Sequence, residues 1–193
     1  RIEQEGNSPL KAALIYMDGM VDSIQLNEAV IKPLLVMPSK TENIASAEYI
    51  ATHILFARDT KINTDFGSAI EGMLYGEAIL LIDGFTDAIN IDAKGWRTRG
   101  IKEPENERVL QGPREGFEEA ALLNLAMLRR KLQTPDLAIE TLRLGRRSGT
   151  MVFICYLDSL IQPQLVETLK QKLSKIDIDG VLDSNYIVEQ LNG

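Results

Sequence analysis

The chain has 193 residues, of which 45% are hydrophobic and 25% charged, an ordinary globular composition that allows one large domain or two small ones. Its formal net charge of −7 argues against binding duplex nucleic acid or an anionic membrane through bulk charge. The single cysteine excludes a disulfide framework within the chain, and no apolar run reaches the roughly 18 to 20 residues needed to span a bilayer. The chain begins Arg1-Ile2-Glu3, without a start methionine or signal-peptide pattern, so we expect a soluble piece of a longer protein.

The first part of the sequence alternates between patterns typical of strands and of helices. Residues 11–17 form a short apolar run that predicts a buried strand ending at Asp18-Gly19. Three helices are expected next, over residues 27–35, 42–55 and 65–75. Asn27 and Asp65 are the expected N-caps of the first and third helices, and Gly76 is the glycine that ends the third.

Two β-hairpins are predicted, each around a loop that contains glycine. The strand pairs are residues 78–83 with 87–92 and residues 137–144 with 151–157. Residues 94–106 are polar, with two glycines and a proline, and are the best candidate linker. Pro163 opens an amphipathic helix with Leu165 on its apolar face, and residues 185–191 predict a short final helix.

Between the linker and the second hairpin, the sequence predicts a central helix that begins after Gly112-Pro113 and ends at Leu132. Proline fits the first turn of a helix, and the basic residues from Arg129 onward complement the helix dipole at its C-terminal end. From residue 120 to residue 127 the only polar side chain is Asn124. We therefore expect a helix packed on more than one side, with a hydrogen-bond partner for Asn124 inside.

These elements predict an α/β protein with two small subdomains, residues 1–107 and 108–193, each with a mixed sheet, a β-hairpin and flanking helices. A weak internal repeat supports the division, since residues 14–21 resemble residues 154–161. In both, an apolar strand ends in Tyr-x-Asp, at Asp18 and at Asp158, before a short loop and an amphipathic helix. The alternative is a single mixed sheet with helices on both faces.

No set of residues in the sequence predicts a catalytic or metal centre. His53 is the only histidine and Cys155 the only cysteine, so a zinc site made of those ligands is excluded. We expect His53 to be a buried or half-buried packing residue and Cys155 to be an inert core thiol. The sequence therefore predicts a protein that is not an enzyme and that uses no cofactor.

One segment resembles a catalytic motif. Asp177-x-Asp179-Gly180-Val181 is similar to the phosphatase motif of the haloacid-dehalogenase family, in which the first aspartate is the nucleophile and a buried strand precedes it. An amphipathic helix is predicted before the segment here, so we expect a polar turn. A phosphatase acting through Asp177 stays as a minor alternative.

Several stretches resemble the A subunits of the GerA-type spore germinant receptors. They include Leu110-x-Gly112-Pro113-Arg114-Glu115-Gly116-Phe117, the run from Asn124 to Lys131, and the run from Tyr16 to Asp22. The resemblance covers residues 10–191 and implies a soluble N-terminal domain on the cytoplasmic side of the spore inner membrane, with a membrane-spanning region after residue 193. It also implies a membrane B subunit and a lipoprotein C subunit as partners, and a role in sensing nutrient germinants or transmitting their signal.

The leading interpretation is a non-enzymatic signalling domain, in which a ligand or a partner subunit biases the packing of two lobes around the helix 114–132. The residues expected to act in binding or in coupling between the lobes are Gly112, Pro113, Arg114, Glu115, Asn124, Arg129, Asp18 and Asp158. The alternative is a two-lobed module that binds an amino acid or sugar where the two strands end in Tyr-x-Asp. No nucleic-acid partner is expected.

Overall fold

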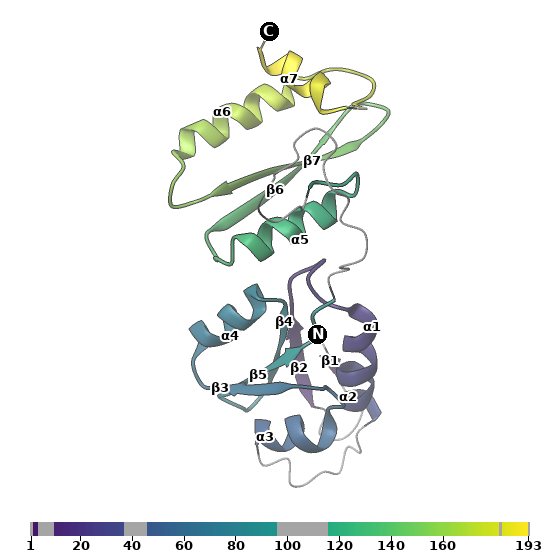
Figure 1. The fold of residues 1–193 in the computed structure, drawn as a ribbon, viewed down its shortest axis with the longest axis vertical. Coiled ribbons are helices and arrows are strands. Elements are labelled where there is room, and N and C mark those ends of the chain that lie inside the picture. Colours follow the sequence, from purple (N-terminus) through teal and green to yellow (C-terminus); the bar gives the residue numbers. More distant parts are fainter. Residues whose placement is uncertain (1, 4–9, 37–45, 96–115, 182, 193) are drawn as a thin grey trace, which may run out of the picture. The chain divides into compact units, whose positions relative to one another are not determined.

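The computed structural model describes residues 2–3, 10–36, 46–95, 116–181 and 183–192 (Figure 1). The chain forms two compact units, Arg1–Thr134 and Pro135–Gly193, and each is described by itself. Helices accompany an antiparallel sheet in both units, which confirms the α/β class; the described sheets are antiparallel rather than mixed. The expected division near residue 107 lies outside the described residues and stays a prediction.

The first unit is built on a five-stranded sheet with the strand order β1-β2-β4-β5-β3. Its strands are β1 (Ile2–Glu3), β2 (Lys11–Ile15), β3 (Thr60–Asn63), β4 (Glu77–Ile82) and β5 (Ala88–Asp92). β4 and β5 form the first predicted hairpin, in which Leu80 pairs with Ile89, and Gly84 has the positive φ of 88° that its turn requires. β3 was not predicted, because its four residues Thr-Lys-Ile-Asn are too few and too polar to show a pattern.

The helical segments of this unit are α1 (Ser23–Leu26), the π-helical η1 (Asn27–Ile31), α2 (Lys32–Val36), α3 (Ala47–Tyr49), the π-helical η2 (Ile50–Ile54), α4 (Phe66–Leu74) and α5 (Ala121–Lys131). The prediction of Asn27 as the first N-cap is wrong. The Asp22 side chain accepts hydrogen bonds from the backbone N–H groups of Ile24 and Gln25, so the helix begins at Ser23. The predicted cap of α4 is confirmed, since Asp65 accepts the Ser68 N–H at 2.8 Å.

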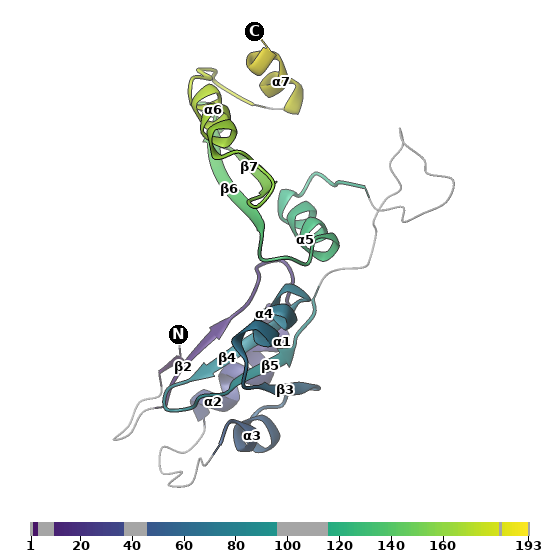
Figure 2. The same cartoon turned by 90° about the vertical axis from the view of Figure 1, so that its left-hand side faces the viewer.

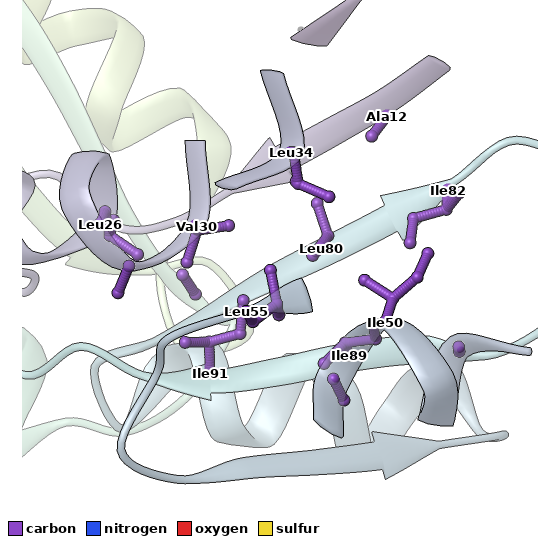
Figure 3. Close-up of a cluster of buried hydrophobic side chains, with 14 of the residues drawn as sticks. Ala12, Leu26, Val30, Leu34, Ile50, Leu55, Leu80, Ile82, Ile89 and Ile91 are labelled. Carbon is purple, nitrogen blue, oxygen red and sulfur yellow. The ribbon is translucent and has the colours of Figure 1, made fainter. Parts of the chain in front are cut away.

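The hydrophobic core of the first unit lies between the sheet and the segments α1 to η2 (Figure 3). Alternate residues of β4 and β5 face these helices because side chains alternate across a strand. The buried side chains include Leu26, Val30, Leu34, Ile50 and Leu55 from the helical side and Leu80, Ile82, Ile89 and Ile91 from the strands. Figure 1 shows α4 on the other side of the sheet, where Ala69 packs against Ile79 and Ala88.

A buried polar contact joins α4 to its face of the sheet. Asn90, only 1% exposed, donates from Nδ2 to the Ala69 carbonyl at 3.0 Å and to the Glu77 carboxylate at 2.9 Å. Its Oδ1 accepts a hydrogen bond from Asn63 Nδ2 at 2.9 Å. A Cβ at Gly72 would lie 2.2 Å from both Asn90 Nδ2 and Glu77 Oε2. Glycine at this position is therefore what allows α4 to approach the sheet.

The second unit is a β-hairpin with two helices. Its elements are β6 (Leu137–Leu144), β7 (Thr150–Leu157), α6 (Pro163–Ser174) and α7 (Ser184–Asn192), and Figure 2 shows α6 along the hairpin. The hairpin, the start of α6 at Pro163 and the final helix are confirmed. The apolar face of α6 differs from the prediction at one position, because Leu165 is 60% exposed while Val166 is buried.

The segment that resembles a phosphatase motif is a loop held by the tip of this hairpin. It follows α6 rather than a strand. The Arg146 N–H donates to the Ile178 carbonyl at 2.9 Å, and the Arg146 side chain lies 3.1 Å from the Asp177 carboxylate. The N–H groups of Arg147 and Ser148 both donate to the Asp179 carbonyl. These contacts account for the polar turn that the sequence predicts.

Candidate functional site

The predicted site residues fall in three places. Gly112, Pro113, Arg114 and Glu115 lie outside the described residues. Asp18, Asn124 and Arg129 belong to the first unit and Asp158 to the second. Asp18 lies in the turn after β2, which packs against α5, the helix that carries Asn124 and Arg129, and we treat this junction as the candidate functional site.

The turn after β2 is built around Asp18 and Gly19. The Asp18 carboxylate accepts the Gly19 N–H at 3.0 Å, and Gly19 has a φ of 77°, in the region that favours glycine. A Cβ at Gly19 would lie 3.5 Å from both the Ala126 side chain and the Leu122 carbonyl oxygen. The turn therefore packs directly against α5. Asp18 is one of the site residues predicted from the sequence and Gly19 is not. The Asp-Gly pair indicates a tight turn, yet nothing local indicates its contact with α5.

The same turn is joined to the end of the segment that follows β5. The Gly95 N–H donates to the Met20 carbonyl at 3.1 Å, and the Asp22 N–H donates to the Ala93 carbonyl at 2.7 Å. A Cβ at Gly95 would lie 2.2 Å from the Asp22 nitrogen, so only glycine allows this approach. Because Asp22 is also the N-cap of α1, the turn connects three elements of the first unit.

α5 begins later and is more exposed than predicted. The helix starts at Ala121, residues 116–120 are not helical, and only Ala126 and Met127 of the helix are buried. Leu122 and Leu123 are 52% and 42% exposed, so the prediction of a helix buried on most sides is wrong. The basic last turn, from Arg129 to Lys131, is confirmed, and Arg129 itself is half-buried.

Asn124 explains where the helix begins. Its Oδ1 accepts the Glu118 N–H and its Nδ2 donates to the Glu118 carbonyl, both at 2.7 Å. This two-point contact satisfies the Glu118 backbone without a helical turn, while Ala120, the N-cap residue, has no capping side chain. The expected partner of Asn124 is therefore the backbone just before the helix rather than a group in the core.

The remaining predicted residue, Asp158, lies just after β7 in the second unit. Its N–H donates to the Asp136 carbonyl at 3.0 Å and extends the hairpin by one pair. Nearby, the Tyr156 hydroxyl donates to Glu140 at 2.7 Å and the Lys170 ammonium lies 2.6 Å from the same carboxylate. Lys170 and Tyr156 lower the pKa of Glu140, and Glu140 in turn raises the pKa values of Lys170 and Tyr156.

The second unit should lose stability as the pH falls through the lowered pKa of Glu140. A folded-state pKa below the unfolded value means that the ionised carboxylate stabilises the fold at higher pH and that protonation removes this contribution. Lys170→Met should raise the pKa of Glu140 toward its ordinary value, measured by NMR titration. Lys172→Met, on the same helix, should leave it unchanged. A Glu140 pKa that Lys170→Met does not move would contradict this assignment.

Two burial predictions are wrong. His53 is exposed; its ring stacks on Tyr49 with centroids 4.5 Å apart, and its Nδ1 lies 2.7 Å from the Thr52 hydroxyl. Ile50 and Ala51 face the core, and His53 falls on the outer side of the same segment. Cys155 is exposed because the residues next to it in β7, rather than Cys155 itself, face the α6 core.

A groove of about 420 Å³ lies on the surface of the first unit. It is lined by Glu28, Lys32, Pro33, Val36, His53, Ile54 and Phe56. Its volume is within the range of small-molecule sites. Across the described parts of the chain, no group of three or more His, Cys, Asp or Glu residues is placed to hold a metal ion.

Comparison with known proteins gives one consistent result. A family model described as the Bacillus/Clostridium GerA spore germination protein matches residues 1–193. The chain is 31% identical over 179 residues to spore germination protein KA of Bacillus subtilis (strain 168), covering 93% of this chain and 32% of that protein. It is 30% identical over 187 residues to spore germination protein B1 of the same organism, and this match covers 96% of this chain and 38% of that protein. The chain thus spans about a third of the length of these relatives.

The fold is shared with a solved structure of the same kind. The crystal structure of the N-terminal domain of the A subunit of the Bacillus megaterium spore germinant receptor GerK3 matches with a TM-score of 0.69 and 25% sequence identity. The match covers 99% of this chain and 69% of that chain. The resemblance seen in the sequence is confirmed: the chain belongs to the GerA family of spore germination proteins and has the fold of the N-terminal domain of a germinant-receptor A subunit.

Proposed function

We propose that this chain helps to sense nutrient germinants or to transmit their signal within the A subunit of a spore germinant receptor. The observation that carries the proposal is the contact between Gly19 and α5. It joins two of the stretches that resemble the A subunits, the run from Tyr16 to Asp22 and the run from Asn124 to Lys131.

The geometry of this junction suits a two-state contact. Packed elements tend to move between discrete arrangements. At this contact Gly19 has no side chain, so α5 lies close to the backbone of the turn. The turn is hydrogen-bonded through Met20 and Asp22 to residues 93–95. A displacement of α5 would therefore reach the segment after β5 and the N-cap of α1.

The resemblance supports further parts of this proposal. The partners would be a membrane B subunit and a lipoprotein C subunit at the spore inner membrane, with this domain on the cytoplasmic side. Membrane attachment would come through a region that follows residue 193. Within the residues that the structure describes, no helix is both long and apolar enough to cross a membrane.

Deleting the gene that encodes this chain should abolish or slow germination in response to at least one nutrient. Germination is measured as the loss of optical density of purified spores after amino acids or sugars are added singly and in mixtures. Restoring the intact gene should restore the response, and equal spore yield and heat resistance control for defects in sporulation. Spores that respond normally to every nutrient would count against a receptor role.

Direct binding of a nutrient is the second candidate function, and the groove beside His53 and Phe56 is the observation that favours it. Calorimetric titration of the chain with amino acids and sugars distinguishes the two roles. Heat that Phe56→Ala removes would support sensing in this groove. No heat and no thermal shift with any nutrient would leave signal transmission as the role of this domain.

A further inference from the structure

The segment that begins with β7 repeats the segment that begins with β2. The residues correspond one to one without insertions, and Leu14 matches Ile154. The Met20 N–H donates to the Met17 carbonyl at 3.1 Å, and the corresponding Leu160 N–H donates to the Leu157 carbonyl at 3.0 Å. The helix that follows begins at corresponding residues, Ser23 and Pro163. The weak repeat seen in the sequence is thus a repeated strand, turn and helix start.

The two strands also present the same face to the helix that follows. Leu14 packs with the core beneath α1 and α2, and its counterpart Ile154 packs with the core beneath α6. Ala12 and its counterpart Val152 do the same. Side chains alternate along a strand, so corresponding residues of β2 and β7 direct their side chains to the same face relative to the helix that follows.

The directions of the backbone hydrogen bonds can be compared in the same way for β2 and β7. The Lys11 carbonyl accepts the Asp83 N–H at 2.9 Å, so alternate residues of β2, including Ala13, bond toward β4. In β7 the bond from the Asp158 N–H to Asp136 means that Tyr156, Ile154 and Val152 bond toward β6. Phe153, the counterpart of Ala13, therefore directs its N–H and carbonyl groups to the outer edge of β7.

That outer edge is where the two units differ. β2 lies between β1 and β4, whereas β7 pairs only with β6 among the described strands. An isolated two-stranded sheet is marginally stable, and backbone groups that point outward from an edge strand, such as those of Met151 and Phe153, are a template for another strand. The solved GerK3 domain contains chain beyond this match, which covers 69% of it.

We infer that the outer edge of β7 binds one further antiparallel β-strand, the counterpart of β4, supplied by the part of the family's N-terminal domain outside this match. The strand is expected to be apolar on the side facing the α6 core, as β4 is apolar on the side facing α1 and α2. β6, the counterpart of β1, then stays at the edge of the completed sheet. This inference is independent of the proposed function.

A matched pair of proline substitutions tests the inference, because Thr141 of β6 lies directly opposite Phe153 of β7. Both N–H groups point away from the hairpin, so proline at either position removes no bond between β6 and β7. In the 193-residue chain, Thr141→Pro and Phe153→Pro should lower the unfolding temperature by similar amounts. In the full-length A subunit only Phe153→Pro should cause a further loss, and Phe153→Ala controls for the missing aromatic ring.

Hydrogen exchange gives the direct readout without a substitution. The Met151 and Phe153 amides should exchange at least about tenfold more slowly in the full-length subunit than in the 193-residue chain, and the Thr141 amide should not change. Protected Val152 and Ile154 amides show that the hairpin is folded in both. Equal exchange of Met151 and Phe153 in the two proteins would overturn the inference. So would protection that appears in the short chain only as its concentration rises, because a second copy would then occupy the edge.

Discussion

Gly19→Leu should abolish or greatly slow nutrient-triggered germination, whereas Gly84→Leu should leave the response close to normal. Both glycines have a positive φ, 77° and 88°, so a side chain at either position causes a similar backbone strain of about 1 to 2 kcal/mol. They differ in their surroundings. A Cβ at Gly19 is already 3.5 Å from Ala126 and from the Leu122 carbonyl, while a Cβ at Gly84 has nothing within 4 Å. The outer atoms of leucine at position 19 would therefore displace α5.

The measurement compares spores whose only intact receptor carries one of the two variants. Thermal unfolding of the 193-residue chain provides the stability control, and the two variants should differ in unfolding temperature by no more than a few degrees. Equal germination of both variants would show that the contact with α5 plays no part in the response. A Gly19→Leu chain that fails to fold would show that the contact is structural only.

Asn90→Leu should lower the free energy of unfolding of the first unit by about 3 kcal/mol, since a buried polar group left without its partner costs about 1 to 3 kcal/mol. Leucine has the same branching at Cγ as asparagine but removes three hydrogen bonds, to Ala69, to Glu77 and from Asn63. Gly72→Ala should cost a comparable amount, because its Cβ would lie 2.2 Å from Asn90 Nδ2. Chemical denaturation followed by circular dichroism measures both.

Asn27→Leu is the matched control, since Asn27 is exposed on η1 and the substitution is the same. It should change the free energy of unfolding by no more than about 0.5 kcal/mol. If Asn90→Leu costs no more than this control, the apolar side chain compensates for the lost hydrogen bonds and α4 is held by its apolar contacts. A large loss for Gly72→Ala alone would identify close packing rather than hydrogen bonding as the main requirement.

Elements that depend on neighbouring residues could be predicted from the sequence. The hairpins β4–β5 and β6–β7 follow from two apolar runs around a glycine loop, and α4 follows from its cap at Asp65 and its terminal glycine at Gly76. The start of α6 at Pro163 has the same local origin. The family could also be recognised from the sequence, because its characteristic stretches are themselves continuous.

Several features were decided by contacts between distant residues, and no local pattern could have revealed them. β3 exists because β5 provides an edge for it, and His53 is exposed because Ile50 and Ala51 occupy the core side of η2. Cys155 lies in an apolar run, yet the single face that α6 covers decides which residues of β7 are buried.

The candidate site shows the same division. Asp18 and Asn124 could be chosen from the sequence, the first as a turn residue at a strand end and the second as the lone polar residue in an apolar run. That Asn124 binds the Glu118 backbone and starts the helix at Ala121 appears only in the structure. So does the contact of Gly19 with α5. A turn is specified by its own residues, but the helix that packs against it is set by the path of the whole chain.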